Sequence, residues 1–592
     1  MVFGPATRLG GAQFVYRGPA PVLIVLMLKI LAAWTVCALL FIGLGAVILR
    51  RFGGSPRILY SFWIGFGAAT AFLDTWNLFL PIHASAPLCL AVIALVGIVE
   101  SRAPLRRELA GYPKMLGWPS LIWFGLIAFL ALRVAGPPDH YDTGLYGAAA
   151  IRWITTYPTV PGLANLHARL GFNISLFPLA AAVQEGMSKS LGFRLLTGFA
   201  LAALWSSIFS SCLRVIREKT ADLPDWYFAI LAIPAVYWAA RARIVGIETD
   251  EPAAAACLLG AGLVLAEIVS SPPGQEFDAE RRARTVAWAT LLALAVSLKE
   301  STAVFAALTW AIGFLLTPWP KKRFEKIALS AIPAGLILIP WLIRGILLSG
   351  YPFFPNPAFG IRATWTVPRV VASFYVAWTR AYARIPDVPI ASTLGAAWLH
   401  PWLHVAAHDR GGLQTPALIS AVGACVVCAL WRNLGRTRVR AAWILAASLP
   451  GIVFWFLEIP DPRFGEAAIW ATAAVLGAMG IVSARMKFRR LRPSLVMAGL
   501  FALTLWCVFS FDWQVSYRPS LSVRSLNPLP VPKLISRRTQ SGLVVFLPAR
   551  GYQCWDAELP CTPYFNRTLR LRVPGNMRWG FASQGMPNLP AH

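Results

Sequence analysis

The feature that most constrains this chain is a series of apolar runs, many of them near 20 residues long, separated by short polar segments. An apolar run of about 20 residues forms a helix long enough to cross the hydrocarbon core of a bilayer. Of the 592 residues, 57% are hydrophobic and only 14% are charged, which is too little charge for the surface of a soluble protein. We therefore predict an all-α polytopic membrane protein. About fourteen spans are expected, at residues 22–49, 58–80, 86–100, 117–135, 192–213, 226–240, 251–270, 286–298, 300–317, 327–348, 413–431, 441–457, 467–484 and 494–511.

Basic residues gather in every second loop between these runs. Seven loops follow the alternation, among them 102–114 and 485–492. An excess of Lys and Arg marks the short cytoplasmic loops of membrane proteins. We therefore place the basic loops on the cytoplasmic side of the cell inner (cytoplasmic) membrane. The long loops 136–191 and 350–412 and the tail 512–592 are then extracytoplasmic, and we expect the active side there.

The net charge of +28 also invites a nucleic-acid interpretation. However, the basic residues form short clusters between apolar runs, and the chain contains no zinc-finger spacing, basic helix or other nucleic-acid module. We therefore expect the bilayer as a partner and no nucleic acid.

The chain divides into three parts. Residues 1–21 have the composition of a disordered extension, residues 22–511 form the membrane domain, and residues 512–592 form a small extracytoplasmic segment. The first apolar run is too long for a signal peptide and lacks a convincing cleavage site, and Met27 is an alternative start.

Parts of the extracytoplasmic segments have local patterns of their own. Residues 142–157 and 365–384 are amphipathic and suit helices that lie at the membrane interface. In the tail, residues 544–546 and 569–573 have the composition of strands. We therefore predict interfacial helices and some β-structure outside the membrane.

The cysteines point to an oxidising compartment for the tail. Cys554 and Cys561 lie seven residues apart, whereas the other seven of the nine cysteines fall in spans. We predict a disulfide between Cys554 and Cys561. Cys425 and Cys428 form a CxxC pair inside a span without further ligands nearby, so we interpret them as apolar thiols.

Ionisable and polar residues near the extracytoplasmic ends of spans are costly in a membrane, so each is a candidate for function. They occur together on one side, which favours a common site. The candidates are Asp139, His140, Asp142, Tyr146, Arg152, His167, Arg169, Asn173, Asp250, Glu251, Lys299, Arg344 and Arg463.

Five of the candidates also have a structural interpretation. Asp142 and Asp250 are suited to cap helix N-termini. Lys299 is suited to an ordinary surface turn, and Arg463 to anchoring a helix end at the interface. For His167, a hydrogen-bonding structural role is favoured over a metal-ligand role.

Carboxylates and cations in one extracytoplasmic cavity suit transfer of a group from a lipid phosphate. A carboxylate can accept the proton of an attacking hydroxyl as general base. Arg and Lys can bind and neutralise a departing phosphate. Attack on the anomeric carbon opposite the phosphate would invert its configuration.

The order of several motifs resembles the GT-C superfamily of integral membrane glycosyltransferases, especially its branch of protein mannosyltransferases and aminoarabinose transferases. The tail is similar to that of an uncharacterised group of bacterial envelope membrane proteins, with Cys-Trp and Pro-Cys-Thr-Pro. The resemblance covers residues 117–470 except 360–440. The matching stretches are 142–150, 167–177, 249–253, 297–300 and 461–464.

This resemblance implies a GT-C-like fold in which Asp142 is the catalytic base and Asp139 assists or orients it. It also implies a polyprenyl-phosphate sugar donor, and such enzymes often need no metal, so no cofactor is predicted. Asp250 and Glu251 would bind sugar or acceptor, and Arg152, Arg169, Lys299, Arg344 and Arg463 form the pool of phosphate ligands.

The chain departs from the family pattern at two places. It has Asp142-Thr143 where adjacent Asp-Glu is usual, with Asp139 three residues before, so either aspartate could be the base. The Gly-Pro that follows the lysine in the family is absent after Lys299, where Glu300 follows.

We therefore expect an inverting glycosyltransferase that acts on an envelope glycan, lipid or protein. The alternatives are a transporter or flippase for lipid-linked glycans and a non-catalytic assembly factor for surface polysaccharide. Transporters often show internal repeats and helices broken at mid-membrane, and neither is clear in this sequence. A cavity on one side that contains Asp142 with Arg or Lys favours transfer, and a two-sided pathway favours transport.

Overall fold

The computed structural model describes residues 20–111, 117–135, 140–217, 221–240, 242–270, 278–317, 323–488, 490–509 and 529–587. Asp139 and most of the expected extension 1–21 lie outside these ranges. Helix α1 already begins at Ala20.

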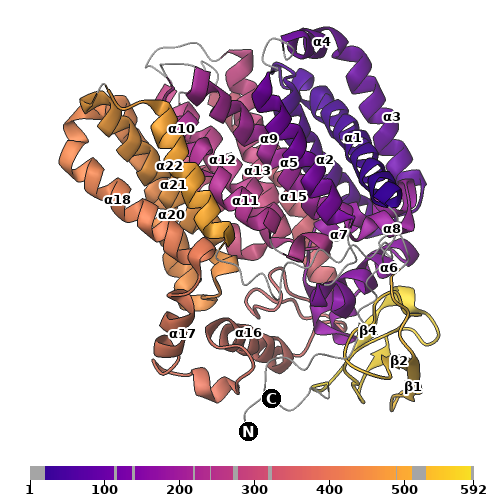
Figure 1. Cartoon of the computed structure of the whole chain (residues 1–592). Coiled ribbons are helices and arrows are strands. Elements are labelled where there is room, and N and C mark those ends of the chain that lie inside the picture. Colours follow the sequence, from indigo (N-terminus) through magenta and orange to yellow (C-terminus); the bar gives the residue numbers. More distant parts are fainter. Residues whose placement is uncertain are drawn as a thin grey trace.

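Most of the chain forms a bundle of long helices that lie side by side (Figure 1). The bundle contains α1 (Ala20–Arg51), α2 (Ile58–Phe79), α3 (Ser85–Glu100), α5 (Trp118–Val134), α9 (Leu195–Arg217), α10 (Leu223–Ile230), α11 (Ala232–Ala240), α12 (Asp250–Ser270), α13 (Ala279–Leu298), α14 (Ala303–Leu316), α15 (Arg323–Ser349), α18 (Thr415–Leu430), α20 (Trp443–Glu458), α21 (Pro462–Lys487) and α22 (Pro493–Phe509).

The expected number of about fourteen spans is wrong for the described residues. Eight helices there are long and apolar enough to cross a membrane, or nine if the pair Ser85–Glu100 and Arg102–Gly111, bent by 73°, counts as one span. The eight are Met27–Arg51, Ile58–Phe79, Leu195–Arg217, Asp250–Val269, Phe324–Ser349, Arg410–Asn433, Arg440–Glu458 and Pro462–Lys487.

Helices also form at the other expected spans, but they are shorter or more charged than a span requires. Three apolar helices, Ser120–Val134, Glu300–Leu316 and Pro493–Phe509, have 17 residues or fewer. The expected span 226–240 is divided between α10 and α11, which have 8 and 9 residues. Helix α13 has 20 residues, but its first turns carry the charged sequence Glu-Arg-Arg-Ala-Arg. The chain therefore has the long apolar helices of a multi-pass membrane protein, with fewer full spans in the described residues than the sequence predicted.

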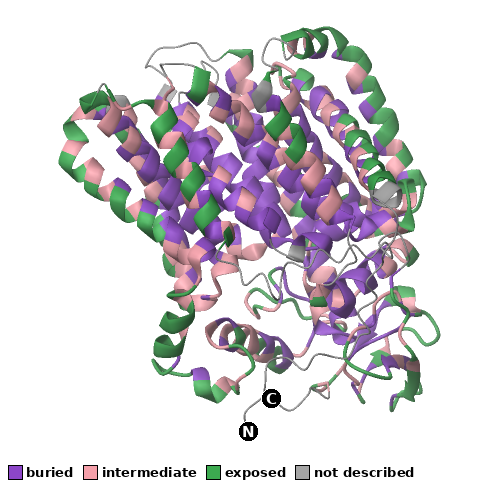
Figure 2. Ribbon diagram, in the orientation of Figure 1, coloured by how far each residue is buried: buried purple, intermediate pink, exposed green. Residues whose placement is uncertain are grey.

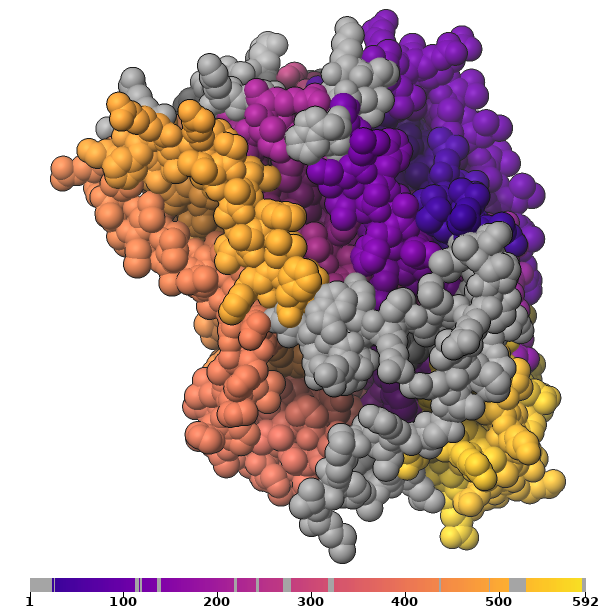
Figure 3. Space-filling view, viewed as in Figure 1, coloured from indigo at the N-terminus to yellow at the C-terminus, as the bar shows by residue number. Residues whose placement is uncertain are grey.

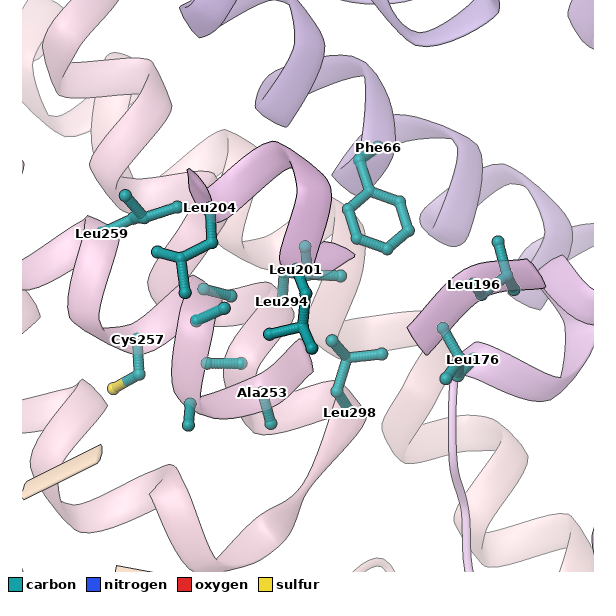
Figure 4. Close-up of a cluster of buried hydrophobic side chains, with 14 of the residues drawn as sticks. Phe66, Leu176, Leu196, Leu201, Leu204, Ala253, Cys257, Leu259, Leu294 and Leu298 are labelled. Carbon is teal, nitrogen blue, oxygen red and sulfur yellow. The ribbon is translucent and has the colours of Figure 1, made fainter. Parts of the chain in front are cut away.

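The centre of the bundle is a continuous apolar core. Leu201 and Leu204 from α9, Cys257 from α12 and Leu294 and Leu298 from α13 are buried together (Figure 4). Helices α12, α13 and α21 bury most of their length, whereas α3 and α18 expose much of theirs (Figure 2). The exposed apolar side chains of the outer helices suit contact with lipid.

Small residues allow the closest helix contacts. A Cβ atom at Gly43 of α1 would overlap the backbone of Ala94 in α3, and one at Gly97 would overlap the backbone of Gly43. Close packing of backbones at small residues is a common way for helices to associate in a membrane.

The basic loops meet at one end of the bundle, which we call the basic end. Arg57 lies 2.5 Å from Glu280, Arg282 lies 2.5 Å from Glu325, and Arg438 lies 2.9 Å from Asp222. Each pair joins loops of the set that the sequence assigned to one side. Helices α4 (Arg102–Gly111) and α19 (Gly435–Val439) belong to the same loops.

The opposite end, which we call the loop end, carries α6 (Ala148–Thr156), α16 (Arg369–Arg384), α17 (Leu399–Ala406) and the C-terminal segment (Figure 1). The expected helix 142–157 forms as a π-helical turn, Thr143–Gly147, followed by α6, and α16 lies within the expected helix 365–384. Helices α7 (Leu176–Gly186) and α8 (Lys189–Gly192) lead back into the bundle. Figure 3 shows that α16, α17 and the C-terminal segment project from the same end.

The C-terminal segment contains two short sheets and a disulfide. Strand β1 (Leu534–Arg538) pairs antiparallel with β2 (Val544–Pro548), and β3 (Arg570–Leu571) pairs antiparallel with β4 (Phe581–Ala582). Strands β2 and β3 coincide with the two expected strand segments. The predicted disulfide between Cys554 and Cys561 is present.

The assignment of the loop end to the extracytoplasmic side stays a prediction that reporter fusions can check. Alkaline phosphatase is active only after export, whereas green fluorescent protein fused to such a chain fluoresces only in the cytoplasm. Phosphatase at the C-terminus of the full chain should be active, and the fluorescent protein at Lys487, where α21 ends at the basic end, should fluoresce. The reverse pattern would invert the topology.

Candidate functional site

A cavity of about 550 Å³ lies at the loop end, where segments far apart in the sequence meet. Its lining comes from residues 140–146 and 169–174, the N-terminal side of α12, the turn after α13, helix α16, the start of α21 and the C-terminal segment. Helix termini and loops hold most of the polar lining, as is usual for binding sites on a rigid scaffold.

Asp142 and Arg169 face each other in this cavity. Arg169 donates a hydrogen bond from Nη1 to Oδ1 of Asp142 at 3.0 Å, and the two side chains are 13% and 31% exposed. The Arg169 guanidinium lies 5.0 Å from the ring centroid of Trp378. Asp142 makes no side-chain hydrogen bond that caps its helix. The carboxylate is therefore held by a cation rather than used as a helix cap.

Two further cations line the cavity in front of a buried carboxylate. Lys299 forms an ion pair with Asp250, and Arg463 Nε lies 4.0 Å from Oδ2 of the same residue. The side chain of Asp250 is 1% exposed, whereas those of Lys299 and Arg463 are 24% and 19% exposed. Both cations lie over the ring of Phe464, at 4.4 and 4.5 Å. Asp250 thus lies behind the cavity wall, and the two cations in front of it are the charged groups that face the cavity.

A histidine and a glutamate form a third polar group. Nε2 of His140 lies 2.8 Å from Oε2 of Glu248, whose other oxygen accepts a hydrogen bond from the Thr249 amide at 3.0 Å. Glu248 therefore accepts the hydrogen bonds of the backbone amides at the start of α12, the role of helix cap that was expected for Asp250. Within the described ranges, no group of three or more His, Cys, Asp or Glu side chains is placed to hold a metal ion.

Tyrosines from several elements surround the Asp142–Arg169 pair. Tyr141 and Tyr146 come from the segment of Asp142, Tyr382 from α16, and Tyr552 and Tyr564 from the C-terminal segment. Burial, together with nearby Tyr564, raises the pKa of Tyr141 to about 12. Burial likewise raises the pKa of Tyr146 well above its ordinary value. These phenols are therefore neutral at physiological pH and available as hydrogen-bond donors.

The structure brings together seven of the residues that the sequence singled out. His140, Asp142, Tyr146, Arg169, Asn173, Lys299 and Arg463 line the cavity. Asp250 lies directly behind it, and Asp139 lies outside the described residues.

The other four candidates have different surroundings. Arg152 binds Asp556 of the C-terminal segment, with Nη1 3.1 Å from Oδ1. His167 is buried with its ring 5.7 Å from that of Tyr564. Arg344 is buried in α15 and donates to Oδ1 of Asn173 at 2.7 Å. Glu251 is 1% exposed and is not part of the cavity lining.

Sequence reasoning missed several lining residues. Glu248 directly precedes the matching stretch 249–253 and was not among the candidates. Trp378 and Tyr382 lie on the amphipathic helix α16, which was the available signal for them. Tyr552 and Tyr564 flank the predicted disulfide, but nothing in the sequence indicated that the tail contacts residues 141–169.

His167 gives the folded chain a defined pH dependence. Burial, aided by the charge of Arg169, lowers the pKa of His167 to about 3, against 6.5 for an exposed histidine. Between these pH values the unfolded chain binds a proton that the folded chain does not, so stability falls as pH falls from about 6.5 toward 3. The loss is at most about 1.4 kcal/mol per pH unit.

The measurement is the thermal unfolding midpoint in detergent at pH 7.5, 6.5 and 5.5. His167→Gln should flatten the decline seen in the wild type, whereas His400→Gln, at an exposed position, should keep it. If both variants keep the wild-type decline, the assignment to His167 is wrong.

The comparisons with known proteins give a family without an assigned activity. No curated protein and no solved structure shows significant similarity to the chain. The model of a domain of unknown function, DUF8201, matches residues 27–470, a range that contains every cavity-lining residue outside the C-terminal segment. The chain belongs to the DUF8201 family.

Proposed function

We propose that this chain is an inverting glycosyltransferase that moves a sugar from a polyprenyl-phosphate donor to an envelope acceptor on the extracytoplasmic side of the inner membrane. The observation that supports this proposal most is that Asp142, Lys299 and Arg463 line a single cavity at the end of the bundle opposite the basic loops.

Asp142 is the proposed general base. Its Oδ2 would meet an acceptor hydroxyl while Arg169 holds Oδ1 at 3.0 Å. The acceptor oxygen would attack the anomeric carbon and give its proton to Asp142. The bond between that carbon and the phosphate oxygen would break, and its electron pair would leave with the phosphate. Because attack and departure are on opposite faces of the sugar, the configuration would invert.

Lys299 and Arg463 are the proposed phosphate ligands. The departing phosphate gains charge, and two cations in a partly buried site stabilise that charge more than they would in water. Asp250 keeps Lys299 in place before the donor binds. Arg463 is held by Asp461, whose Oδ2 lies 3.0 Å from its Nε, together with the more distant Asp250. In this assignment Asp250 supports the cations and does not itself touch the sugar, which revises the role expected from the sequence.

The remaining wall suits a sugar and its acceptor. Trp378, Tyr382, Tyr552 and Tyr564 offer apolar ring faces together with hydroxyl or indole donors. His140, Tyr146, Asn173 and Glu248 add polar groups that could select among sugar hydroxyls. Arg152, His167, Glu251 and Arg344 fit structural roles better, and Asp139 keeps its proposed assisting role.

The transporter alternative requires a polar pathway that opens at both ends of the bundle. The cavity lining instead belongs to the loop end, and the charges of the basic end form their own pairs. This distribution favours transfer over transport. A non-catalytic assembly factor would bind the donor in the same cavity without turning it over.

A transfer assay tests the base. Asp142→Asn should lower kcat by about 100-fold or more, because the amide keeps the shape but cannot accept the proton. The donor KM should change little, since the phosphate ligands remain. Glu100→Gln, which neutralises an exposed carboxylate at the basic end, is the control and should keep wild-type turnover. Equal turnover in Asp142→Asn and the wild type would show that Asp142 is not the base.

A second assay tests the phosphate ligands. Lys299→Met alone leaves Asp250 without one of its cations, so we combine it with Asp250→Asn. This double variant should raise the donor KM by about 10- to 100-fold, the range for one charge-assisted hydrogen bond. Lys299→Arg, which keeps the charge, should stay within a few fold of the wild type. An unchanged KM in the double variant contradicts the assignment.

A further inference from the structure

The loop that the Cys554–Cys561 disulfide closes lies against both segments that carry the Asp142–Arg169 pair. We call residues 552–564 the disulfide loop. It begins after β2 and contributes Tyr552 and Tyr564 to the cavity wall. Both cysteines are buried, at 1% and 2% exposed.

Its first contact is with the helical segment of Asp142. The Trp555 amide donates to the carbonyl oxygen of Gly144 at 2.8 Å, and Nε2 of Gln553 donates to the carbonyl oxygen of Tyr141 at 2.9 Å. The two accepting residues lie on either side of Asp142. A Cβ atom at Gly144 would lie 2.5 Å from Cε2 of Trp555, so only glycine gives the loop this approach.

Its second contact is with the segment of Arg169. Oγ1 of Thr562 donates to the carbonyl oxygen of Leu166 at 2.9 Å. The Tyr564 and His167 rings pack in a T-shaped arrangement, with centroids 5.7 Å apart. The disulfide joins the two halves of the loop between these contacts, because Trp555 and Thr562 each neighbour a bridged cysteine.

A third contact ties the loop to α6 and α8. Asp556 accepts hydrogen bonds from Arg152, at its backbone carbonyl (2.6 Å) and at Oδ1 (3.1 Å), and its Oδ2 lies 2.7 Å from Nζ of Lys189. This contact accounts for Arg152, whose charge serves the loop rather than the cavity.

We propose that the disulfide loop is a positioning element for the Asp142–Arg169 pair. By holding Gly144 on one side and Leu166 on the other, it fixes the separation of two groups that lie 27 residues apart in the sequence. Without the cross-link the Thr562 side stays hydrogen-bonded to Phe546 of β2, but the Trp555 side is joined to it only through residues 556–560, so the separation is less closely set. The activity arm of the test rests on the proposed function, whereas the conformational arm does not.

The disulfide also determines in which compartment the site takes its final geometry. Disulfides form in oxidising compartments and not in the cytosol. The base is therefore held in its working position only after the C-terminal segment has reached an oxidising compartment.

The conformational arm uses hydrogen–deuterium exchange of the full chain in detergent. The variant Cys554→Ser/Cys561→Ser should exchange at least 10-fold faster than the wild type at the amides of residues 141–148 and 166–170. Exchange in α12 and α13 should stay unchanged. Cys425→Ser/Cys428→Ser, which removes two exposed free cysteines, is the matched control and should behave as the wild type. Unchanged exchange at both segments in the disulfide variant overturns the proposal.

A second variant reaches the same contact without altering the disulfide. Gly144→Ala places a methyl group against the Trp555 ring and should displace the loop, whereas Gly125→Ala meets open space and should be silent. In the transfer assay, Gly144→Ala and the disulfide variant should lower kcat at least 10-fold with the donor KM within about threefold, since Lys299 and Arg463 are untouched.

The two proposals fail in different ways. If the disulfide variant exchanges faster than the wild type but no protein, including the wild type, transfers a sugar, the positioning role stands and the proposed function is wrong. If the wild type transfers a sugar and both variants have the same kcat as the wild type, the proposed function stands and the positioning role is wrong. If the variants lose activity only because the donor KM rises, while kcat is unchanged, the positioning of the base is also contradicted.

Discussion

Three charged side chains from three helices meet at the loop end, and the architecture of the site depends on their pairing. Asp250 opens α12, Lys299 follows the last residue of α13, and Arg463 lies in the first turn of α21. A carboxylate as buried as Asp250 costs several kcal/mol unless cations compensate it. The same ion pairs that neutralise it therefore fix the ends of three helices relative to one another and leave two cations facing the cavity.

Much of the fold could be predicted from hydropathy and from the placement of Lys and Arg. Helices occur at every expected span, and the basic loops contact one another across the bundle as the alternation required. The number of full spans could not be predicted, because composition does not show where a helix ends. The break between Ile230 and Ala232 and the charged start of α13 reduce two expected spans to helices that do not meet the requirement by themselves.

The site could be predicted in part for a similar reason. Asp142, Arg169, Lys299 and Arg463 were recognisable because a membrane protein rarely places charges near span ends without a use. Their sidedness alone did not separate Arg169 from Arg152 or Arg344, since the three arginines differ in which partner lies nearby. Those partners are Asp142, Asp556 and Asn173, and the contact of Arg152 with Asp556 joins residues 404 positions apart, beyond the reach of local pattern. The contribution of Tyr552 and Tyr564 was hidden by the same separation.

The floor of the cavity, which we define as the segment around Asn173, tolerates substitution less than the walls formed by α16 and the C-terminal segment. Asn173 lines the cavity and also accepts a hydrogen bond from buried Arg344, while its neighbour Ser175 donates to buried Asp74 of α2 at 2.6 Å. A substitution at Asn173 or Ser175 would remove a hydrogen bond from a buried polar side chain inside the bundle. In the parts of α16 and the C-terminal segment that the structure describes, no charged residue is buried. Changes in what the cavity binds are thus best accommodated on these two walls, while the buried polar groups beneath the floor constrain its side chains.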